Sequence, residues 1–257
     1  MDGRLRKING ALNIAEVAQF LGFKYLFLPK ENANEASAIS NIKVIPLETL
    51  EDAILFLENR KIIDFQKFKP KNYNITDIPD FSEICGQEKA KRALMISAAG
   101  GHNMLMIGPP GVGKSLLAKA LIGILPDLNF EESIEITKIW SAAGLTSEGL
   151  INQRPYRSPH HTSSLVSIIG GGQSPKPGEI SLAHGGILFL DELPEFPRNI
   201  LEALRQPLES GLVHIARAKN TLVFPANFSL VAAMNPCPCG FYGDEEKECH
   251  CSAYEIL

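Results

Sequence analysis

A short run of residues near the middle of the chain has the types and the spacing of a phosphate-binding loop. It fits the pattern G-x-x-x-x-G-K-[ST] at every fixed position and reads Gly108-Pro109-Pro110-Gly111-Val112-Gly113-Lys114-Ser115. The glycines allow backbone N–H groups to turn toward an anion, and the start of a helix adds the positive end of its dipole. Lys114 would place a charge at the outer phosphates, and Ser115 would give an oxygen ligand to Mg²⁺. The loop therefore predicts a site for ATP and Mg²⁺.

The residues on either side of this loop have the patterns that such a loop needs. Residues 103–107 are a short apolar run, which predicts a buried strand, and residues 115–125 carry apolar side chains at helical spacing. A glycine-rich turn that holds a lysine by chance would need neither flank. We therefore expect a strand, the loop and a helix in direct succession.

Two adjacent acidic residues form the second chemical element. Asp191 and Glu192 follow an apolar run at residues 186–190, which predicts a buried strand. Such a strand delivers both carboxylates at the carboxyl edge of a sheet, where ligands of open α/β folds bind. Asp191 would hold Mg²⁺ through its water shell, and Glu192 would orient and deprotonate the attacking water. The alternative, a strand that ends in a solvated acidic turn, is disfavoured because a phosphate loop precedes it.

The composition limits the classes of protein that the chain can belong to. Its 257 residues are 45% apolar and 21% charged, which is ordinary for a globular domain or a domain with a smaller companion. No apolar run is long enough to cross a bilayer, and the N-terminus lacks the apolar core of a secretion signal. We therefore expect a cytoplasmic protein with no membrane partner. A net charge of −4 leaves contact with nucleic acid to a local basic patch.

The chain divides by its patterns into a small N-terminal part, a linker and a larger core at residues 81–257. Helix and strand signals alternate over residues 1–60, which predicts an α/β unit with a parallel sheet, and Thr49 with Asp52 can cap a helix at residues 50–59. Residues 61–80 are basic without sustained periodicity, so we expect a linker that either contacts nucleic acid or forms a solvated face. The other expected elements are helices at residues 14–21, 34–40 and 199–211 and strands at residues 25–28, 43–45 and 228–234.

The core resembles the AAA+ domain of the magnesium-chelatase-like ATPases, the YifB/ComM group of bacteria. The resemblance rests on the phosphate loop and on residues 85–94, 98–103, 154–162, 170–172, 177–184 and 235–240, which read CGQEKAKRAL, AAGGHN, RPYRSPHHT, GGG, PGEISLAH and NPCPCG. It implies an α/β fold of the P-loop NTPase class with a parallel sheet. It also implies ATP and Mg²⁺ as cofactors, self-assembly into a hexameric ring, and packing of the segment in front of Gln87 near the adenine.

Residues 1–60 resemble the second half of a Lon-protease-like domain. The matching stretches are Asp2-Gly3-x-Leu5, Gly10 and residues 22–24, 29–32 and 44–47. Lon peptidases carry a catalytic lysine shortly after the glycine near position 10, whereas residues 10–14 contain no lysine. A Ser–Lys pair needs both members within hydrogen-bond reach, so we expect this partial Lon-like domain to be non-catalytic.

Two further elements take their expected roles from the resemblance. Asn235 stands at the sensor 1 position, where its amide can hydrogen-bond the γ-phosphate or the attacking water, although Asn-Pro is also a common start of a turn. Residues 212–224 alternate between apolar and polar and predict a hairpin with Arg217 and Lys219 at its tip. In the chelatase-like group this hairpin lines the ring pore, which makes both side chains candidates for contacts with DNA phosphates. An ordinary polar turn is the alternative.

Three other polar residues have structural interpretations. His160 and His161 have no third ligand at the spacing of a metal site, so we expect a loop role for both. Arg205 lies on the expected helix at residues 199–211. It could reach the nucleotide of a neighbouring subunit, or it could pair with Glu202 or Glu209, and we favour the pairing.

The cysteines gather near the C-terminal end in two C-x-C pairs, which are Cys237 with Cys239 and Cys249 with Cys251. Four sulfurs suit a tetrahedral Zn²⁺, and such clustering in a cytosolic protein argues against disulfides. His250 offers a competing ligand. We predict a structural Zn²⁺ site, with free reduced thiols as the alternative.

Three functions remain open at this point. The first is an ATP-binding and ATP-hydrolysing module of a ring motor that acts on DNA in branch migration, recombination or competence. The second is an ATPase that drives Mg²⁺ insertion by a chelatase, and the third is a nucleotide-binding assembly module without turnover. The Lon-like part favours the first, because that fusion is typical of the YifB/ComM group, and Glu192 argues against the third. By the resemblance, residues 1–257 lack the arginine finger and the helical lid, so we expect impaired hydrolysis.

Overall fold

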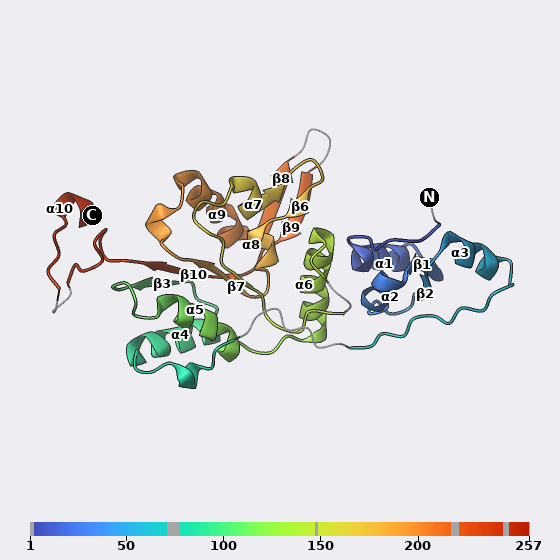
Figure 1. Cartoon of the computed structure of the whole chain (residues 1–257), viewed down its shortest axis with the longest axis horizontal. Helices are drawn as coiled ribbons and strands as arrows, with labels where there is room; N and C mark the ends of the chain where they lie inside the picture. Colours follow the sequence, from blue (N-terminus) through green and yellow to red (C-terminus); the bar gives the residue numbers. More distant parts are fainter. Residues whose placement is uncertain (1–2, 71–77, 147–148, 217–220, 244–246, 257) are drawn as a thin grey trace. The chain divides into compact units, whose positions relative to one another are not determined.

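The computed structural model describes residues 3–70, 78–146, 149–216, 221–243 and 247–256 (Figure 1). The chain forms two compact units. Unit 1 comprises residues 1–75 and 128–153, and unit 2 comprises residues 76–127 and 154–257. The expected division into an N-terminal part, a linker and a core, with boundaries at residues 60 and 80, stays a prediction. The structure adds that residues 128–153, which follow the phosphate-loop helix in the sequence, belong to unit 1.

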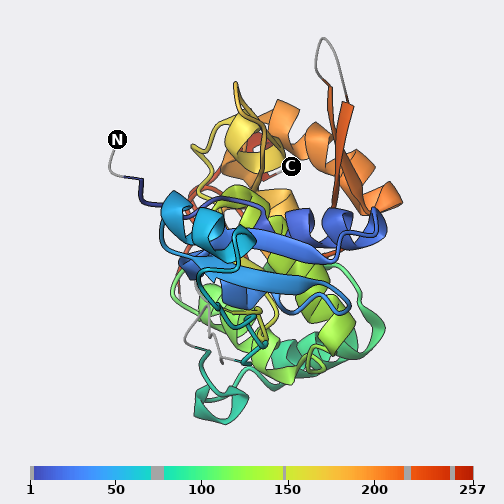
Figure 2. The same ribbon diagram turned by 90° about the vertical axis from the view of Figure 1, so that its right-hand side faces the viewer.

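Unit 1 is built on a two-stranded parallel sheet, as the alternating signals predict. β1 (Tyr25–Pro29) pairs with β2 (Lys43–Leu47), and the two strands lie side by side in Figure 2. The helices of the unit are α1 (Ala11–Phe20), α2 (Lys30–Ala36), α3 (Leu50–Leu57) and α6 (Phe130–Ala143). Leu12, Ala33 and Val44 are fully buried in its core.

Side-chain caps set the starts of α3 and α6. The Thr49 hydroxyl accepts a hydrogen bond from the backbone N–H of Asp52, and the Asp52 carboxylate accepts one from the N–H of Thr49. This capping box confirms the expected cap. Asn129 and Glu132 form the same reciprocal pair at the start of α6, a helix that the sequence analysis missed.

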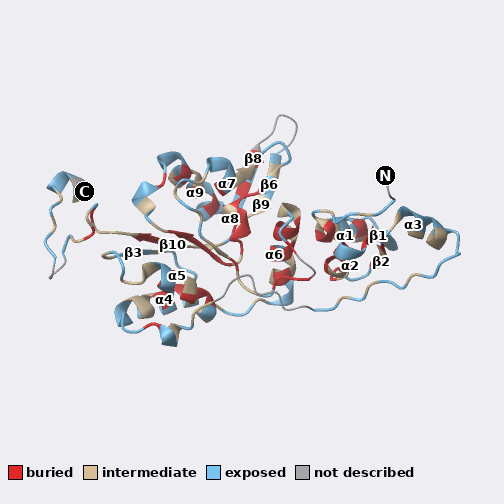
Figure 3. Ribbon diagram, viewed as in Figure 1, coloured by how far each residue is buried: buried red, intermediate tan, exposed pale blue. Residues whose placement is uncertain are grey.

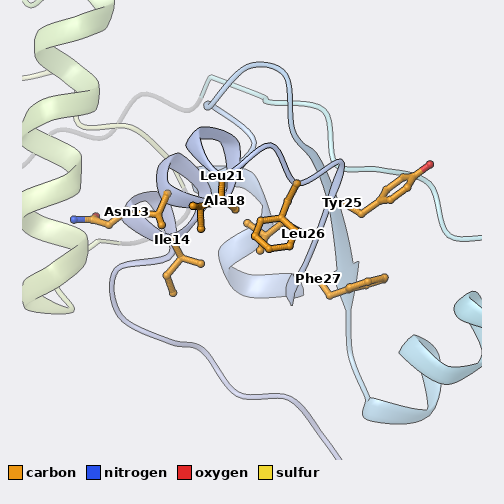
Figure 4. Close-up of a pocket in the computed structure, with 9 residues that line it drawn as sticks. Asn13, Ile14, Ala18, Leu21, Tyr25, Leu26 and Phe27 are labelled. Carbon is orange, nitrogen blue, oxygen red and sulfur yellow. The ribbon is translucent and has the colours of Figure 1, made fainter.

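An apolar hollow of about 620 Å³ opens beside α1 and β1 (Figure 4). Its walls are side chains without charge, namely Asn13, Ile14, Val17, Ala18, Leu21, Phe23, Tyr25, Leu26 and Phe27. Val17, Leu21 and Phe23 keep more than half of their surface exposed. This lining holds no acid, base or nucleophile apart from the phenol of Tyr25, so the hollow is not a candidate for catalysis.

Unit 2 is built on a four-stranded parallel sheet in the order β3-β10-β7-β4. The strands are β3 (Met104–Ile107), β10 (Ser229–Met234), β7 (Ile187–Leu190) and β4 (Tyr156–Arg157). Every residue of β7 is buried (Figure 3), as expected for an inner strand of a sheet that is covered on both faces.

The strand that precedes the phosphate loop differs from the expectation in one respect. β3 forms at the expected place but lies at the edge of the described sheet. Leu105 and Ile107 are therefore about half exposed, while Met106 is buried on the other face. The prediction of a buried strand is wrong for β3 because apolar character alone does not distinguish an edge strand from an inner one.

Unit 2 also contains several helices. α4 (Glu88–Gly100) precedes β3, and α5 (Lys114–Ala120) follows the phosphate loop and continues into the 3₁₀ turn Leu121–Ile124. The others are α7 (Leu165–Ile169), α8 (Glu179–Leu182), α9 (Arg198–Ser210) and α10 (Ala253–Ile256), with 3₁₀ turns at Phe81–Glu83 and Leu193–Glu195. α9 contains Pro207 and ends where Gly211 adopts a left-handed conformation, as is common at helix ends.

Two antiparallel hairpins complete unit 2. β5 (Gly170–Gly171) pairs with β6 (Lys176–Pro177) in the glycine-rich stretch. β8 (Leu212–Ala216) pairs with β9 (Thr221–Pro225), which confirms the expected hairpin, but Arg217 and Lys219 at its tip lie outside the described residues. Among the residues that the structure describes, no helix has the length and apolar character to cross a membrane.

Candidate nucleotide-binding site

The sheet of unit 2 brings together residues that are far apart in the sequence. β10 lies between β3 and β7 and runs parallel to both. The phosphate loop, Asn235 and the Asp191–Glu192 pair therefore follow the carboxyl ends of three adjacent strands. This edge is where open α/β sheets bind their ligands.

Two glycines give the phosphate loop its conformation. Gly111 and Gly113 have φ angles of +83° and +87°, which residues with side chains rarely adopt. These angles turn successive backbone N–H groups as an anion-binding loop requires. α5 begins directly after Gly113, so Lys114 and Ser115 are the first residues of the helix.

The ammonium group of Lys114 joins the loop to the end of β10. Its Nζ donates hydrogen bonds to the carbonyl oxygens of Gly108 at 2.7 Å and Pro109 at 3.0 Å, and to Oδ1 of Asn235 at 3.0 Å. Burial lowers the pKa of Lys114, and the charge of Asp191 partly opposes this shift. The structure thus places a cation and a neutral amide, both predicted for the site, in direct contact.

The two oxygen groups expected to hold Mg²⁺ also meet. The Ser115 hydroxyl donates a 2.6 Å hydrogen bond to Oδ2 of Asp191, while Oδ1 of Asp191 accepts one from the backbone N–H of Glu192. A hydroxyl and a carboxylate are the hard oxygen ligands that Mg²⁺ prefers. These residues therefore fit the ion that the sequence predicts.

Glu192 has an unusual backbone and a partner that the sequence analysis did not assign. Its φ of 52° is left-handed, which is uncommon for a residue other than glycine and occurs often at functional sites. Its Oε2 lies 3.3 Å from Nδ1 of His161, whose ring packs on Phe196 and against His160. The loop role expected for His161 therefore includes a contact with the candidate catalytic carboxylate, and no local sequence signal would have revealed it.

A cavity of about 490 Å³ lies beside these groups. Its walls come from the loop after β4, from the ends of β7 and β10 and from the segments that follow these two strands, namely His161, Glu192, Pro194, Glu195, Met234, Asn235, Pro236, Cys237, Pro238 and Ile256. Glu192 and Asn235 therefore face one common space, in which a water molecule or a phosphate could be reached from both.

A salt bridge fixes the strand next to β7. Arg157 on β4 donates two hydrogen bonds, at 2.6 and 2.8 Å, to the two carboxylate oxygens of Glu179 on α8. On the neighbouring residue, the ring of Tyr156 stacks on Phe189 of β7, and burial raises the pKa of its phenol. Arg157 and Tyr156 of the stretch RPYRSPHHT thus both make contacts that hold β4 in place. The loop that carries His161 begins directly after this strand.

Two predicted groups fall outside this site. Arg205 lies 3.3 Å from Glu209 on the exposed face of α9, in agreement with the expected pairing. The four cysteines expected to bind Zn²⁺ lie within 4.8 Å of one another, and only Cys237 among them lines the cavity described above.

The comparison with known families agrees with this geometry. A phosphate loop, an acidic pair and an asparagine at the ends of adjacent parallel strands define a P-loop NTPase fold. Residues 80–257 match the protein family described as magnesium chelatase, subunit ChlI. The match covers more than half of the chain, so the chain belongs to this family, and the expected AAA+ core of the magnesium-chelatase-like type is confirmed.

Curated relatives are similar over nearly the whole chain. A protein called YifB from Escherichia coli K12 is 44% identical over 253 residues, which are 97% of this chain and 49% of that protein. Competence protein ComM from Haemophilus influenzae is 45% identical over 251 residues, 94% of this chain and 48% of ComM. The chain thus spans about half the length of these relatives.

The likeness to magnesium chelatase itself is weaker. The magnesium-chelatase 38 kDa subunit of Rhodobacter capsulatus is 27% identical over 175 residues, which are 61% of this chain and 50% of that subunit. A structure of the complex between the magnesium chelatase subunits BchI and BchD matches with a TM-score of 0.50 and 27% identity, covering 63% of this chain and 56% of that one.

Proposed function

We propose that this chain contains the ATP-binding and ATP-hydrolysing site of a ring-forming AAA+ motor that acts on DNA. The observation that carries the proposal is the meeting of Lys114 with Asn235, and of Ser115 with Asp191, at the edge of one parallel sheet. Each pair joins residues from separate parts of the sequence, and each has the chemistry that phosphates or Mg²⁺ require.

Each residue of the site has a distinct role in this proposal. Backbone N–H groups of residues 108–113 and the Lys114 ammonium bind the β- and γ-phosphates. Ser115 and Asp191 hold Mg²⁺, which neutralises charge on the phosphates when it is bound. Glu192 accepts a proton from the attacking water, and the amide of Asn235 orients that water or the γ-phosphate.

His161 is a positioning residue in this scheme. Its ring nitrogen lies 3.3 Å from the Glu192 carboxylate, and packing on Phe196 restrains the ring. A carboxylate held by this contact is aimed in one direction, whereas a free side chain with 60% exposure would sample several. The contact therefore supports a role in aligning Glu192.

DNA is the proposed substrate, and identical subunits are the proposed partners in a hexameric ring. The 45% identity to a competence protein favours a DNA-related role over a chelatase role, since the identity to the magnesium-chelatase subunit is only 27%. The hairpin β8–β9 carries Arg217 and Lys219 in its connecting turn. A basic turn in a chain with a net charge of −4 is suited to contacts with phosphate.

An experiment on DNA-stimulated turnover tests this function. ATP hydrolysis is measured on a protein that spans the full length of the YifB and ComM relatives, without DNA and with single- or double-stranded DNA. Stimulation by DNA supports the motor, whereas hydrolysis that DNA leaves unchanged supports the chelatase-type alternative. Binding of Mg²⁺ and ATP without turnover in either condition supports the assembly module.

A salt titration of DNA binding tests the basic turn separately. The double variant Arg217→Ala/Lys219→Ala should bind DNA more weakly across all sequences, and its salt dependence should fall by about one unit per residue removed. ATP affinity should remain that of the wild type. Unchanged DNA affinity and an unchanged slope would contradict the role of the turn.

A further inference from the structure

Residues 237–251, called the cysteine segment below, carry four cysteines. The sulfur atoms of these cysteines form a compact cluster. The Sγ atom of Cys237 lies 3.3 Å from that of Cys239 and 3.7 Å from that of Cys249, and Cys239 lies 3.6 Å from Cys249. The four Sγ atoms, including that of Cys251, all lie within 4.8 Å of one another. A disulfide would need about 2.05 Å, and all four cysteines are free.

These distances match those of a tetrahedral metal site. With a Zn–S bond of about 2.3 Å, the sulfurs of a four-thiolate site lie about 3.8 Å apart. His250, which competes as a ligand in the sequence, is not a member of this group. Four sulfurs without nitrogen or oxygen select a soft, thiophilic ion, and Zn²⁺ is the usual occupant of a closed site of this kind.

The backbone around the cluster is arranged to support thiolates. The N–H of Tyr242 donates to the Sγ of Cys237 at 3.3 Å, and the N–H of Cys239 donates to the Sγ of Cys251 at 3.4 Å. Gly240 makes the tight turn possible, because its φ is +85° and its N–H donates to the carbonyl of Cys237. Hydrogen bonds of this kind, made to the ligand atoms themselves, orient metal ligands.

Burial does not account for the arrangement of the described residues that follow Gly240. None of the described side chains from residue 241 onward is buried, and Tyr254 is 93% exposed. A segment without a hydrophobic core needs another source of stability, and a structural metal is one of the few available.

We propose that the cysteine segment binds one Zn²⁺ through Cys237, Cys239, Cys249 and Cys251, and that the bound ion braces the nucleotide site. The brace has two contacts. Cys237 lies two residues after Asn235 and lines the same cavity as Glu192. The turn at Gly240 packs so closely on the phosphate loop that a Cβ there would lie 2.7 Å from Cδ of Pro110.

Metal analysis tests the ligand set. Protein purified under reducing conditions should contain about one Zn²⁺ per chain, and Cys249→Ser or Cys251→Ser should lower the metal content at least about tenfold. Cys85→Ser is the matched control, since Cys85 is exposed and outside the cluster, and His250→Ala should also retain the metal. Absence of any thiophilic metal from the wild type, or its loss from His250→Ala, would overturn the four-thiolate assignment.

Cobalt substitution keeps the proposal testable if the serine variants fail to fold. The wild type with Co²⁺ in place of Zn²⁺ should show the intense thiolate-to-cobalt absorption of a tetrahedral four-sulfur site. A spectrum that indicates bound nitrogen or oxygen ligands would contradict the proposal.

Hydrogen exchange tests the brace without any need for ATP turnover. Removal of Zn²⁺ by a chelator should speed amide exchange in residues 237–256 and also in the phosphate loop, and added Zn²⁺ should restore protection in both. Faster exchange in the cysteine segment alone, with the loop unchanged, would overturn the brace. Because the readout is amide exchange, a failure of the proposed DNA motor function would leave this result intact.

Discussion

The nucleotide site and the cysteine segment belong to the same unit but obtain their order in different ways. The nucleotide site stands on a sheet whose inner strands are anchored in the core: every residue of β7 is buried, and Leu188 and Val231 have 0% exposure. The cysteine segment has no buried side chain among the described residues after Gly240. Hydrophobic burial therefore positions the first site before any ligand binds, whereas in our proposal a bound metal ion orders the second. The two regions should then respond to different perturbations.

Glu192→Gln should have the largest effect on the chemistry of the nucleotide site. The amide keeps the size of the side chain but cannot accept a proton, so ATP hydrolysis should fall by about 10²–10⁴-fold while ATP affinity is retained. The measurement is steady-state turnover together with calorimetric ATP binding. Glu202→Gln on the exposed side of α9 is the control and should hydrolyse ATP at the wild-type rate. Full activity of Glu192→Gln would show that another group is the base.

Leu188→Ala should distinguish the site built on the hydrophobic core from the segment that we propose a metal ion to order. Leu188 is fully buried in β7, so the cavity that its truncation leaves should lower the free energy of unfolding by about 2–5 kcal/mol. Removal of Zn²⁺, in contrast, should leave the main unfolding transition of the sheet in place and loosen the cysteine segment first. Denaturant unfolding followed by circular dichroism measures both effects. A single cooperative loss of the whole unit on chelation would remove the distinction between the two regions.

His161→Ala should produce an intermediate effect. Loss of the 3.3 Å contact leaves Glu192 without its restraint, so hydrolysis should fall by about tenfold with unchanged ATP affinity. His161→Asn can retain a hydrogen bond to the carboxylate and should recover part of the rate. Equal rates for both variants and the wild type would show that the contact is only structural.

Thr49→Ala in unit 1 should have the smallest effect. Loss of the α3 cap should cost about 1 kcal/mol of stability in that unit, and ATP affinity should not change.

A hydrogen bond from Lys61 and others from the cap lower the pKa of Asp52 to about 2. The stabilisation by this carboxylate is therefore present above the unfolded value of about 3.9 and is lost as the pH falls through about 2. Acid titration of the wild type by NMR checks the pKa, and a normal value would contradict the hydrogen bonds that Lys61 and the cap donate to this carboxylate.

The sequence predicts those parts of the nucleotide site that depend on local patterns. The phosphate loop is contiguous, and Asp191, Glu192 and Asn235 each follow an apolar run, so their strands could be predicted and the structure brings their ends together. The contact between His161 and Glu192 could not be predicted, because it depends on how the loop after β4 folds over the end of β7.

One helix was missed and another, expected at residues 34–40, was misplaced, and each error has a physical cause. α6 was not predicted although Asn129 and Glu132 form a capping box that is visible in the sequence. α2 begins earlier than expected because the face that it buries includes the polar residues Asn32 and Glu35, which conceal its apolar periodicity. Asn32 is buried because it exchanges two hydrogen bonds with the backbone of Ile8, a partner that periodicity cannot reveal.

Calorimetric titration of Mg²⁺ and ATP into the wild type, Lys114→Ala and Lys119→Ala tests the central claim most directly. Lys114 contacts the phosphate loop and Asn235, whereas Lys119 lies further along the same helix. Loss of the charge at the phosphates should weaken ATP binding by about 100-fold or more in Lys114→Ala, while Lys119→Ala should bind as the wild type does. Equal affinity of the wild type and Lys114→Ala would contradict the assignment of this loop as the ATP site.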